Sequence, residues 1–249
     1  RPESDSGIPD DSSAHSTFWD WVAMSPETHQ HVLWQMSDRA IPRSYRMMEG
    51  FSINTFRFVG GSKGTPQLVR FHLKPRLGIH SLLWEEAQTL RGCDSDFLRR
   101  DLWDAMAAGV QAEWDFGVQM IPDCSGNAEE YQSLCKKLGF DPVDPTKFWP
   151  EEDIPVMKCG VLELNSNVSD FFAETEQVAF CPADLIPGVD LSHDPVLQVR
   201  AFSYIDTQLT RLGGPNFNQL PINRAKNAVI SNNQRGGHHQ SLIAQGRVS

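Results

Sequence analysis

Residues 194–215 read DPVLQVRAFSYIDTQLTRLGGP, and this stretch carries the strongest structural signal in the chain. Asp194 is a good N-cap residue, and Pro195 suits the first helical position because its missing N–H would have no partner there. The Gly-Gly-Pro run at 213–215 is typical of a helix end. Together the two signals predict a helix over residues 195–212.

One face of this predicted helix carries an unusual set of polar side chains. Arg200, Tyr204, Gln208 and Arg211 follow one another at intervals of four, four and three residues, which places them on one face. A guanidinium one turn away favours the ionised form of a tyrosine. A phenolate oxygen binds hard metal ions such as ferric iron, and the second arginine is suited to a bidentate pair with a carboxylate. The alternative is an exposed stripe in which an arginine stacks on the tyrosine ring.

The rest of the chain predicts a mixture of helices and strands. Residues 1–16 are rich in Ser, Asp and Pro and predict an extended lead-in, and Ser25-Pro26 is typical of a helix start. Two apolar, β-branched runs predict a hairpin, and further elements follow. The expected strands are 51–59, 67–73, 114–121 and 161–164, and the expected helices are 81–90, 96–108 and 129–138. This mixture predicts the α+β class.

Composition and charge exclude several classes of protein. The 249 residues hold 22 Lys and Arg against 32 Asp and Glu, so the formal net charge is −10. A general nucleic-acid binder carries a basic surface, so we expect no nucleic-acid partner. No apolar run approaches the roughly 18 residues of a membrane-spanning helix, so we expect no membrane insertion. Five cysteines without C-x-x-C spacing predict buried, reduced thiols, with a Cys124–Cys135 bridge left open.

The helix motif and several other stretches resemble one enzyme family. Residues 200–208 (RAFSYIDTQ) resemble the proximal haem-ligand motif of monofunctional haem catalases. The resemblance is to the large-subunit branch, fungal-type, and it extends over roughly residues 17 to 235. Further stretches resemble the family in the same order along the chain: FWDWVAMSPETHQHVLWQMSDRAIPRSYRMMEGF from Phe18, HSLLWEEAQ from His80, RRDLWDAM from Arg99, DPTKFWPEE from Asp144, FFAETEQVAFCP from Phe171 and RLGGPNFNQLPINR from Arg211.

The resemblance implies a role for each residue of the polar stripe. Tyr204 would be the proximal ligand of the haem iron, bound as phenolate, and Arg200 would stabilise that phenolate by charge and hydrogen bonding. Arg211 would pair with a haem propionate. Some members of this branch link the proximal tyrosine covalently to a residue at the position of Cys181, which makes a Cys181–Tyr204 link a hypothesis for this chain. Other residues at haem-lining positions of the family are Phe180, Val196, Ser203 and Gln208.

The family fold is an antiparallel β-barrel with a wrapping segment and a helical region, so the resemblance implies this fold, incomplete in the present chain. On this basis the chain divides into a lead-in at residues 1–16, a core with the proximal haem site at 17–240, and a tail at 241–249. Family members carry a distal His and Asn before the aromatic cluster, and the large-subunit branch adds a C-terminal flavodoxin-like domain. Neither has a match here, and the first residue is Arg1, so we expect a processed chain, a truncated chain or a fragment.

The implied activity is haem-dependent disproportionation of hydrogen peroxide to water and oxygen, which protects against oxidative stress, in a homo-tetramer. The distal pair performs the acid–base work on peroxide, so this chain would supply the proximal tyrosine and no distal catalytic residue. The alternatives are a haem-binding chain of this fold without peroxide turnover and a truncated chain that binds nothing. The terminus Arg247-Val248-Ser249 is not the peroxisomal tripeptide. We expect a soluble chain, cytoplasmic or secreted, and the sequence does not decide its compartment.

Overall fold

The computed structural model describes residues 2–3, 5–11, 13–60 and 64–224. The predicted tail at 241–249 and the last part of the predicted core therefore lie outside the described residues. The chain divides into two compact units. The first unit comprises Arg1–Phe51, Phe71–Val118 and Val156–Asn167, and the second comprises Ser52–Arg70, Gln119–Pro155 and Val168–Ser249.

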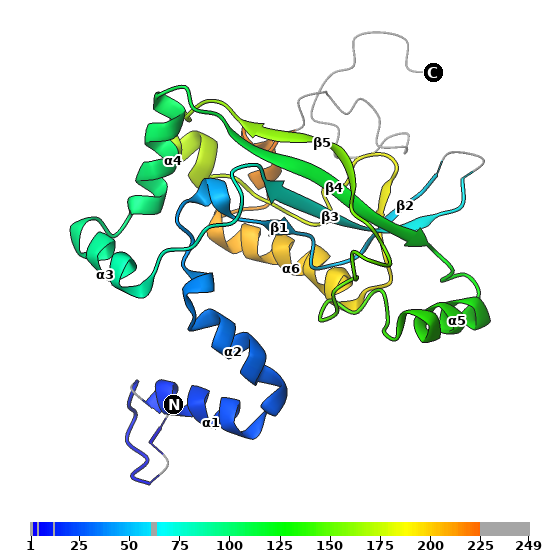
Figure 1. The fold of residues 1–249 in the computed structure, drawn as a ribbon, viewed down its shortest axis with the longest axis horizontal. Helices are drawn as coiled ribbons and strands as arrows, with labels where there is room; N and C mark the ends of the chain where they lie inside the picture. Colours follow the sequence, from blue (N-terminus) through cyan, green and yellow to red (C-terminus); the bar gives the residue numbers. More distant parts are fainter. Residues whose placement is uncertain (1, 4, 12, 61–63, 225–249) are drawn as a thin grey trace. The chain divides into compact units, whose positions relative to one another are not determined.

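The described chain mixes helices and strands, as the sequence predicts (Figure 1). Within the described residues, no helix combines the length and the apolar character that a bilayer span requires. The α-helices are α1 (Ser13–Met24), α2 (His29–Gln35), α3 (Trp84–Cys93), α4 (Phe97–Ala107), α5 (Ala128–Leu138) and α6 (Pro195–Arg211). Short 3-10 segments lie at Pro26–Thr28, Asp38–Ala40, Tyr45–Met47 and Phe217–Gln219, and a π segment lies at Phe172–Glu176. The strands are β1 (Gly50–Phe51), β2 (Phe56–Phe58), β3 (Gln67–Pro75), β4 (Ala112–Pro122), β5 (Met157–Leu164) and β6 (Val189–Leu191).

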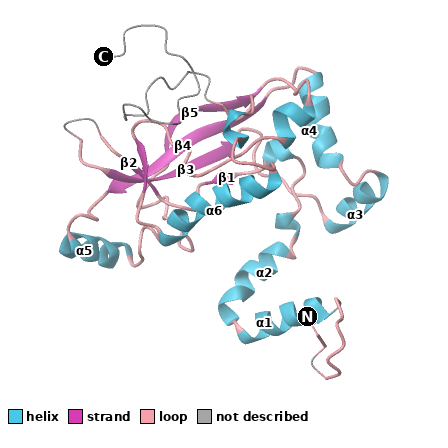
Figure 2. Cartoon of the chain, turned by 180° about the vertical axis from the view of Figure 1, so that it is seen from behind, coloured by secondary structure: helices cyan, strands magenta, loops and turns pink. Residues whose placement is uncertain are grey.

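The described strands form one sheet in the order β5-β4-β3-β2-β6, with β1 paired to β3. Figure 2 shows β2 to β5 of this sheet. The pairs β1–β3, β2–β3, β2–β6 and β4–β5 are antiparallel. In the hairpin, Phe56 lies opposite Val69 and Phe58 lies opposite Gln67, so the predicted hairpin is confirmed. An antiparallel sheet combined with helices confirms the α+β class.

The predicted strand at 51–59 is wrong as a single strand. The chain forms the two short strands β1 and β2 instead, with a break between them. Asn54 and Thr55 lie in this break and are buried. Their side chains bond to distant groups: Asn54 to the Asp194 carboxylate and Thr55 to the Pro142 carbonyl. These tertiary hydrogen bonds outweigh the strand preference of the apolar residues around them.

The lead-in predicted at 1–16 is wrong in its last residues, because α1 begins at Ser13. The α1 sequence SAHSTFWDWVAM contains neither Gly nor Pro, so helical hydrogen bonding extends upstream of the aromatic cluster. The aromatic residues Phe18 and Trp19 contact each other within this helix at 5.1 Å between ring centroids.

The five cysteines are free thiols, and no Cys124–Cys135 bridge is formed. The prediction that they are buried is wrong, because Cys93 and Cys159 are exposed and the other three are half-buried. Cys159 is exposed because it lies on β5, whose residues are almost all exposed.

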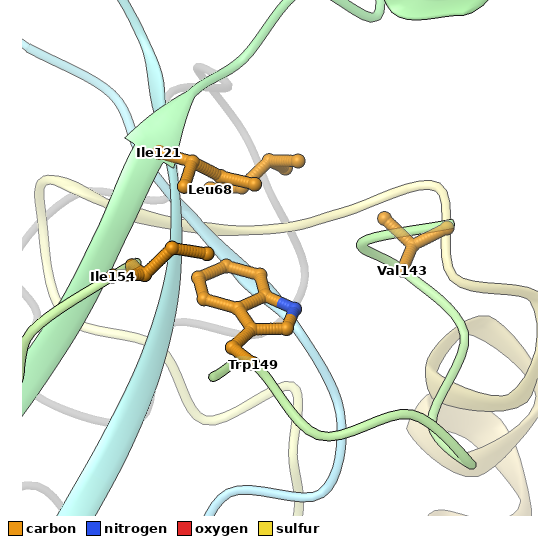
Figure 3. Packing of buried hydrophobic residues seen from close by; sticks show 5 residues of the cluster. All are labelled: Leu68, Ile121, Val143, Trp149 and Ile154. Carbon is orange, nitrogen blue, oxygen red and sulfur yellow. The ribbon is translucent and has the colours of Figure 1, made fainter. Parts of the chain in front are cut away.

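The hydrophobic core of the second unit lies beside the break between β1 and β2. Its cluster consists of Leu68, Ile121, Val143, Trp149 and Ile154 (Figure 3). The indole Nε1 of Trp149 donates to the carbonyl of Pro142 at 3.1 Å, and the Thr55 hydroxyl donates to the same carbonyl at 2.8 Å. The core therefore holds Thr55, the residue that follows Asn54, in place. A separate cluster of Met106, Ala112 and Trp114 packs in the first unit.

Candidate functional site

Helix α6 begins and ends within one residue of the predicted bounds. The Asp194 side chain caps it: Oδ1 accepts hydrogen bonds from the backbone N–H groups of Val196 at 2.8 Å and Leu197 at 3.2 Å. Pro195 occupies the first helical position. Just past the helix end, Gly213 adopts a φ of +80°, a left-handed conformation that glycine tolerates and other residues resist. Local signals at both ends therefore define this helix.

The polar stripe of α6 points inward over most of its length. Gln208 is 8% exposed, Arg200 and Tyr204 are half-buried, and Arg211 is exposed. The guanidinium of Arg200 does lie over the Tyr204 ring, 5.3 Å from its centroid. The alternative of an exposed stripe is nevertheless wrong for three of its four residues. Apolar side chains of α6 are exposed instead: Val196, Val199, Phe202, Ile205 and Leu209.

A chain of hydrogen bonds joins Tyr204 to the N-cap of α6. Arg200 donates from Nη2 to the Tyr204 hydroxyl oxygen at 2.6 Å and from Nη1 to the Oδ1 atom of Asn54 at 2.8 Å. Asn54 donates from Nδ2 to the Oδ2 atom of Asp194 at 2.7 Å. Asp194 is fully buried, so the polar contacts at this end of the hydrogen-bond chain are shielded from water. The arrangement holds one guanidinium in place and presents it to a phenolic oxygen.

Sequence reasoning missed Asn54 as a member of this site. Asn54 lies 146 residues before Arg200, and the residue type alone carries no particular chemistry. The contact exists because β2 pairs with β6, where Phe56 lies opposite Leu191. That pairing brings the residues before β2 to the chain that follows β6, where α6 begins. The one available signal was a polar Asn-Thr pair inside an otherwise strand-like run.

At the other end of the stripe, Arg211 and Gln208 hold the chain segment that leads to Phe180. Arg211 donates to the Gln208 Oε1 atom from Nε at 3.0 Å and from Nη2 at 2.7 Å. It also donates from Nη1 to the Glu176 carbonyl at 2.7 Å and from Nη2 to the Val178 carbonyl. Gln208 donates from Nε2 to the Phe180 carbonyl at 3.4 Å. Of the five N–H donors of a guanidinium, one at Nη1 is left without a partner among the described residues.

The remaining predicted residues lie on α6 or beside it. Ser203 is half-buried on the helix, and Val196 is 45% exposed near its start. The side chain of Phe180 is 73% exposed, although its carbonyl contacts the helix. The Cys181 thiol donates to the carbonyl of Ala201 at 3.4 Å, so this cysteine also lies against α6. The structure thus gathers every predicted haem-site residue on one helix and the segment next to it.

The chemistry of this arrangement is that of a single oxygen donor supported by a cation. The described residues contain no group of three His, Cys, Asp or Glu side chains placed to hold a metal ion. Tyr204 offers a donor of another kind, because one phenolic oxygen backed by a guanidinium suits an ion that already has other ligands, as in a macrocycle. The exposed apolar side chains of Val196 and Phe180 suit a flat apolar group.

Comparison with known proteins gives one consistent result. The family model described as Catalase matches residues 1–249. The chain is 53% identical to Catalase HPII of Pseudomonas putida, 51% identical to Catalase-2 of Bacillus subtilis and 47% identical to Catalase A of Aspergillus fumigatus. Each match covers 100% of this chain and 34%, 35% and 32% of the relative, so the chain spans about a third of the length of these relatives. The predicted family resemblance is thereby confirmed, and the chain belongs to the catalase family.

Proposed function

We propose that this chain forms the proximal haem-binding part of a catalase, which converts two molecules of hydrogen peroxide to two of water and one of oxygen. The observation that carries the proposal is the Arg200–Tyr204 pair, with 2.6 Å between Nη2 and the phenolic oxygen. A family match over residues 1–249 supports it, as do the names of the relatives, which are catalases. The biological role that follows is protection against oxidative stress.

The residues around Tyr204 fit haem by their chemistry. A phenolate is a hard anionic ligand of the kind that holds haem iron in one class of haem proteins. Phe180 and Val196 offer exposed apolar surface to the macrocycle. One N–H at Nη1 of Arg211 has no partner among the described residues, and we assign it to a haem propionate. Ser203 and Gln208 complete the proposed lining of the haem.

The residues of this chain act by electrostatics and positioning. The positive charge of Arg200 stabilises negative charge on the Tyr204 oxygen, and that anionic oxygen in turn favours ferric iron. Asn54 and Asp194 keep the guanidinium of Arg200 aimed at this oxygen. Ferric haem bound here supplies the redox chemistry, in which one peroxide is reduced to water and a second is oxidised to oxygen. Proton transfer to and from peroxide requires an acid–base pair, which we assign to residues outside this chain.

The fold and assembly follow from the same proposal. We infer that the antiparallel sheet belongs to the family's β-barrel, which is completed by strands outside this chain, with a wrapping segment and a helical region around it. Among the described strands, β5 lies at the edge of the sheet, which supports this inference because an edge strand is suited to further pairing. The assembly is a homo-tetramer. The net charge of −10 supports the absence of a nucleic-acid partner.

The test uses the gene product at its full natural length and, separately, the 249-residue chain. Haem is titrated into each protein while the Soret absorbance is recorded, and oxygen evolution from hydrogen peroxide is then measured. We expect haem binding and rapid oxygen evolution from the full-length protein. Haem binding without oxygen evolution would support the alternative, a haem protein of this fold without turnover. A full-length protein that folds but binds no haem contradicts the proposal.

A further inference from the structure

A second layer of buried polar contacts lies behind the Asn54–Arg200 bond. Thr55 is fully buried, and its hydroxyl oxygen accepts from Nε of Arg70 at 2.9 Å while donating to the Pro142 carbonyl at 2.8 Å. The carbonyl of Thr55 accepts from the hydroxyl of Ser192, and that hydroxyl accepts from the backbone N–H of Asp194 at 3.2 Å. Thr55 is thus bonded through both its side chain and its backbone to fixed parts of the second unit.

Arg70 is the charged member of this layer, and the residue is 6% exposed. Besides the bond to Thr55, it donates from Nη1 to the Lys147 carbonyl and from Nη2 to the Asp144 carbonyl at 2.9 Å and the Pro142 carbonyl at 3.4 Å. Its guanidinium also lies 5.0 Å from the centroid of the Trp149 ring. The partners in these hydrogen bonds are neutral. Burial disfavours the charged guanidinium and lowers the pKa of Arg70 to about 10, although the nearby acidic side chains act in the opposite direction.

A buried guanidinium held mostly by neutral groups is costly, and an apolar residue would pack there at lower cost. What the guanidinium adds is a fixed direction, because its planar donors bind Thr55 and three carbonyls at once. Thr55 follows Asn54 directly in the chain, and adjacent Cα atoms are about 3.8 Å apart across a planar peptide. The position of Thr55 therefore limits where the Asn54 amide can lie.

We propose that Arg70 and Thr55 are positioning residues for the proximal site. They fix the Asn54 amide, and Asn54 in turn fixes the Arg200 guanidinium against Tyr204. The amide of Asn54 both donates to Asp194 and accepts from Arg200, so a small rotation weakens both bonds together. This inference rests on the haem function proposed above.

The test compares variants of the full-length gene product loaded with haem. Thr55→Val keeps the shape of the side chain and removes the hydroxyl, and Thr55→Ser restores the hydroxyl. We expect Thr55→Val to shift the visible absorption bands of the bound haem and to speed haem loss by roughly fivefold, as for one lost hydrogen bond. Thr55→Ser should return both values toward those of the wild type. Tyr204→Phe provides the reference spectrum for a lost ligand.

A matched control separates positioning from stability. Ser44 is another buried hydroxyl residue, 2% exposed, and it donates to Asp101 in the first unit. Ser44→Ala should lower the unfolding temperature without moving the haem bands. If Thr55→Val lowers the unfolding temperature and leaves the bands and haem loss at wild-type values, the positioning role is refuted.

A second variant covers the case in which Thr55→Val does not fold. Arg70→Lys keeps the positive charge but loses the planar donors, so it should shift the haem bands in the same direction. Unchanged bands in a folded Arg70→Lys protein would overturn the inference. If the wild-type protein itself binds no haem, or Tyr204→Phe leaves its spectrum unchanged, the proposed haem function fails, and this inference fails with it. That result differs from unchanged bands in the Thr55 and Arg70 variants, which would overturn the positioning role alone.

Discussion

The carboxylate of Asp194 and the side-chain amide of Asn54 meet at 2.7 Å across 140 residues of sequence. Asp194 is at once the N-cap of α6 and the acceptor that holds Asn54. Asn54 holds Arg200, which bonds to Tyr204. One buried carboxylate therefore stabilises the helix and orients the group that acts on the phenolic oxygen, so its loss should affect both stability and the site.

Asp194→Ala should lower the free energy of unfolding by about 2 to 4 kcal/mol, since it removes an N-cap and leaves a buried amide without its acceptor. Asn127→Ala is the matched control. Asn127 caps α5 through a bond from the Glu129 N–H at 3.1 Å, in an exposed position, so its loss should cost only about 1 kcal/mol. Chemical denaturation of both variants measures the difference. Equal losses would show that the Asn54 contact adds nothing to stability.

Tyr204→Phe should abolish haem retention and peroxide turnover while the fold is kept. The phenyl ring fills nearly the same volume, but the oxygen that we propose as iron ligand is gone. Haem content after gel filtration and oxygen evolution measure the effect. The control is Tyr131→Phe, which removes the phenolic oxygen of a tyrosine on α5. The Tyr131 hydroxyl donates to Asp141, and its loss should leave the haem content unchanged. Full haem retention by Tyr204→Phe would contradict the proposed ligand.

Arg200→Lys should slow peroxide turnover by about tenfold or more, the effect of losing one charge-assisted hydrogen bond. A lysine keeps the charge, but its single nitrogen cannot replace the two ends of a guanidinium that reach Asn54 and Tyr204 together. The control is Arg76→Lys, because Arg76 also pairs through two nitrogens, with Glu113 and Asp115, at a more exposed position. Turnover at the wild-type rate in Arg200→Lys would show that charge alone is sufficient.

The parts of the structure that local signals define could be predicted from the sequence. The bounds of α6 follow from an N-cap Asp, a Pro in the first turn and a Gly past the end. The hairpin of β2 and β3 follows from two apolar runs around a Gly-rich turn. In each case the interactions that decide the element lie within a few residues of it.

The parts that depend on distant contacts could not be predicted. The run at 51–59 has the composition of one strand, yet it breaks where Asn54 and Thr55 bond to groups far along the chain. The sequence also could not predict that the polar stripe of α6 points inward, because apolar residues such as Phe202 usually face the core. Here buried polar partners hold Arg200 inward, and Phe202 is exposed.

Acid should weaken the first unit through Asp101. The pKa of Asp101 is held below its ordinary value, chiefly by the hydrogen bond from Arg46 and also by that from Ser44. Because the folded pKa lies below the unfolded one, near 3.9, the ion pair contributes its full stability above about pH 4 and loses it as the pH falls through the folded pKa. Asp101→Asn should therefore lower the unfolding temperature at pH 7, and the gap from the wild type should narrow below about pH 4.

The control for this titration is Asp20→Asn, a change at an exposed carboxylate on α1. It should leave the unfolding temperature near that of the wild type at both pH values. Thermal unfolding monitored by circular dichroism over this pH range makes the comparison. If the difference in unfolding temperature between Asp101→Asn and the wild type stays constant with pH, the ion pair with Arg46 does not contribute to stability.

The haem-loaded protein should join Cys181 to Tyr204 when it is exposed to peroxide. The Cys181 thiol already lies against α6 at Ala201, three residues before Tyr204. A carbon–sulfur bond forms as the S–H bond of the thiol and one C–H bond of the tyrosine break, and one hydrogen peroxide accepts the two hydrogen atoms, as two protons and two electrons, to become two molecules of water. Cleavage after Lys158, Arg200 and Arg211 then leaves the two residues on the separate peptides 159–200 and 201–211.

Mass spectrometry should find these two peptides joined, at the sum of their masses less two hydrogen atoms. Cys181→Ser should abolish the joined species. Cys124→Ser, a change at another half-buried thiol of the second unit, should leave it in place because Cys124 contacts Pro122 rather than α6. Recovery of peptides 159–200 and 201–211 in full and unlinked, from protein that has turned over peroxide, would rule out the link and leave Tyr204 held by Arg200 alone.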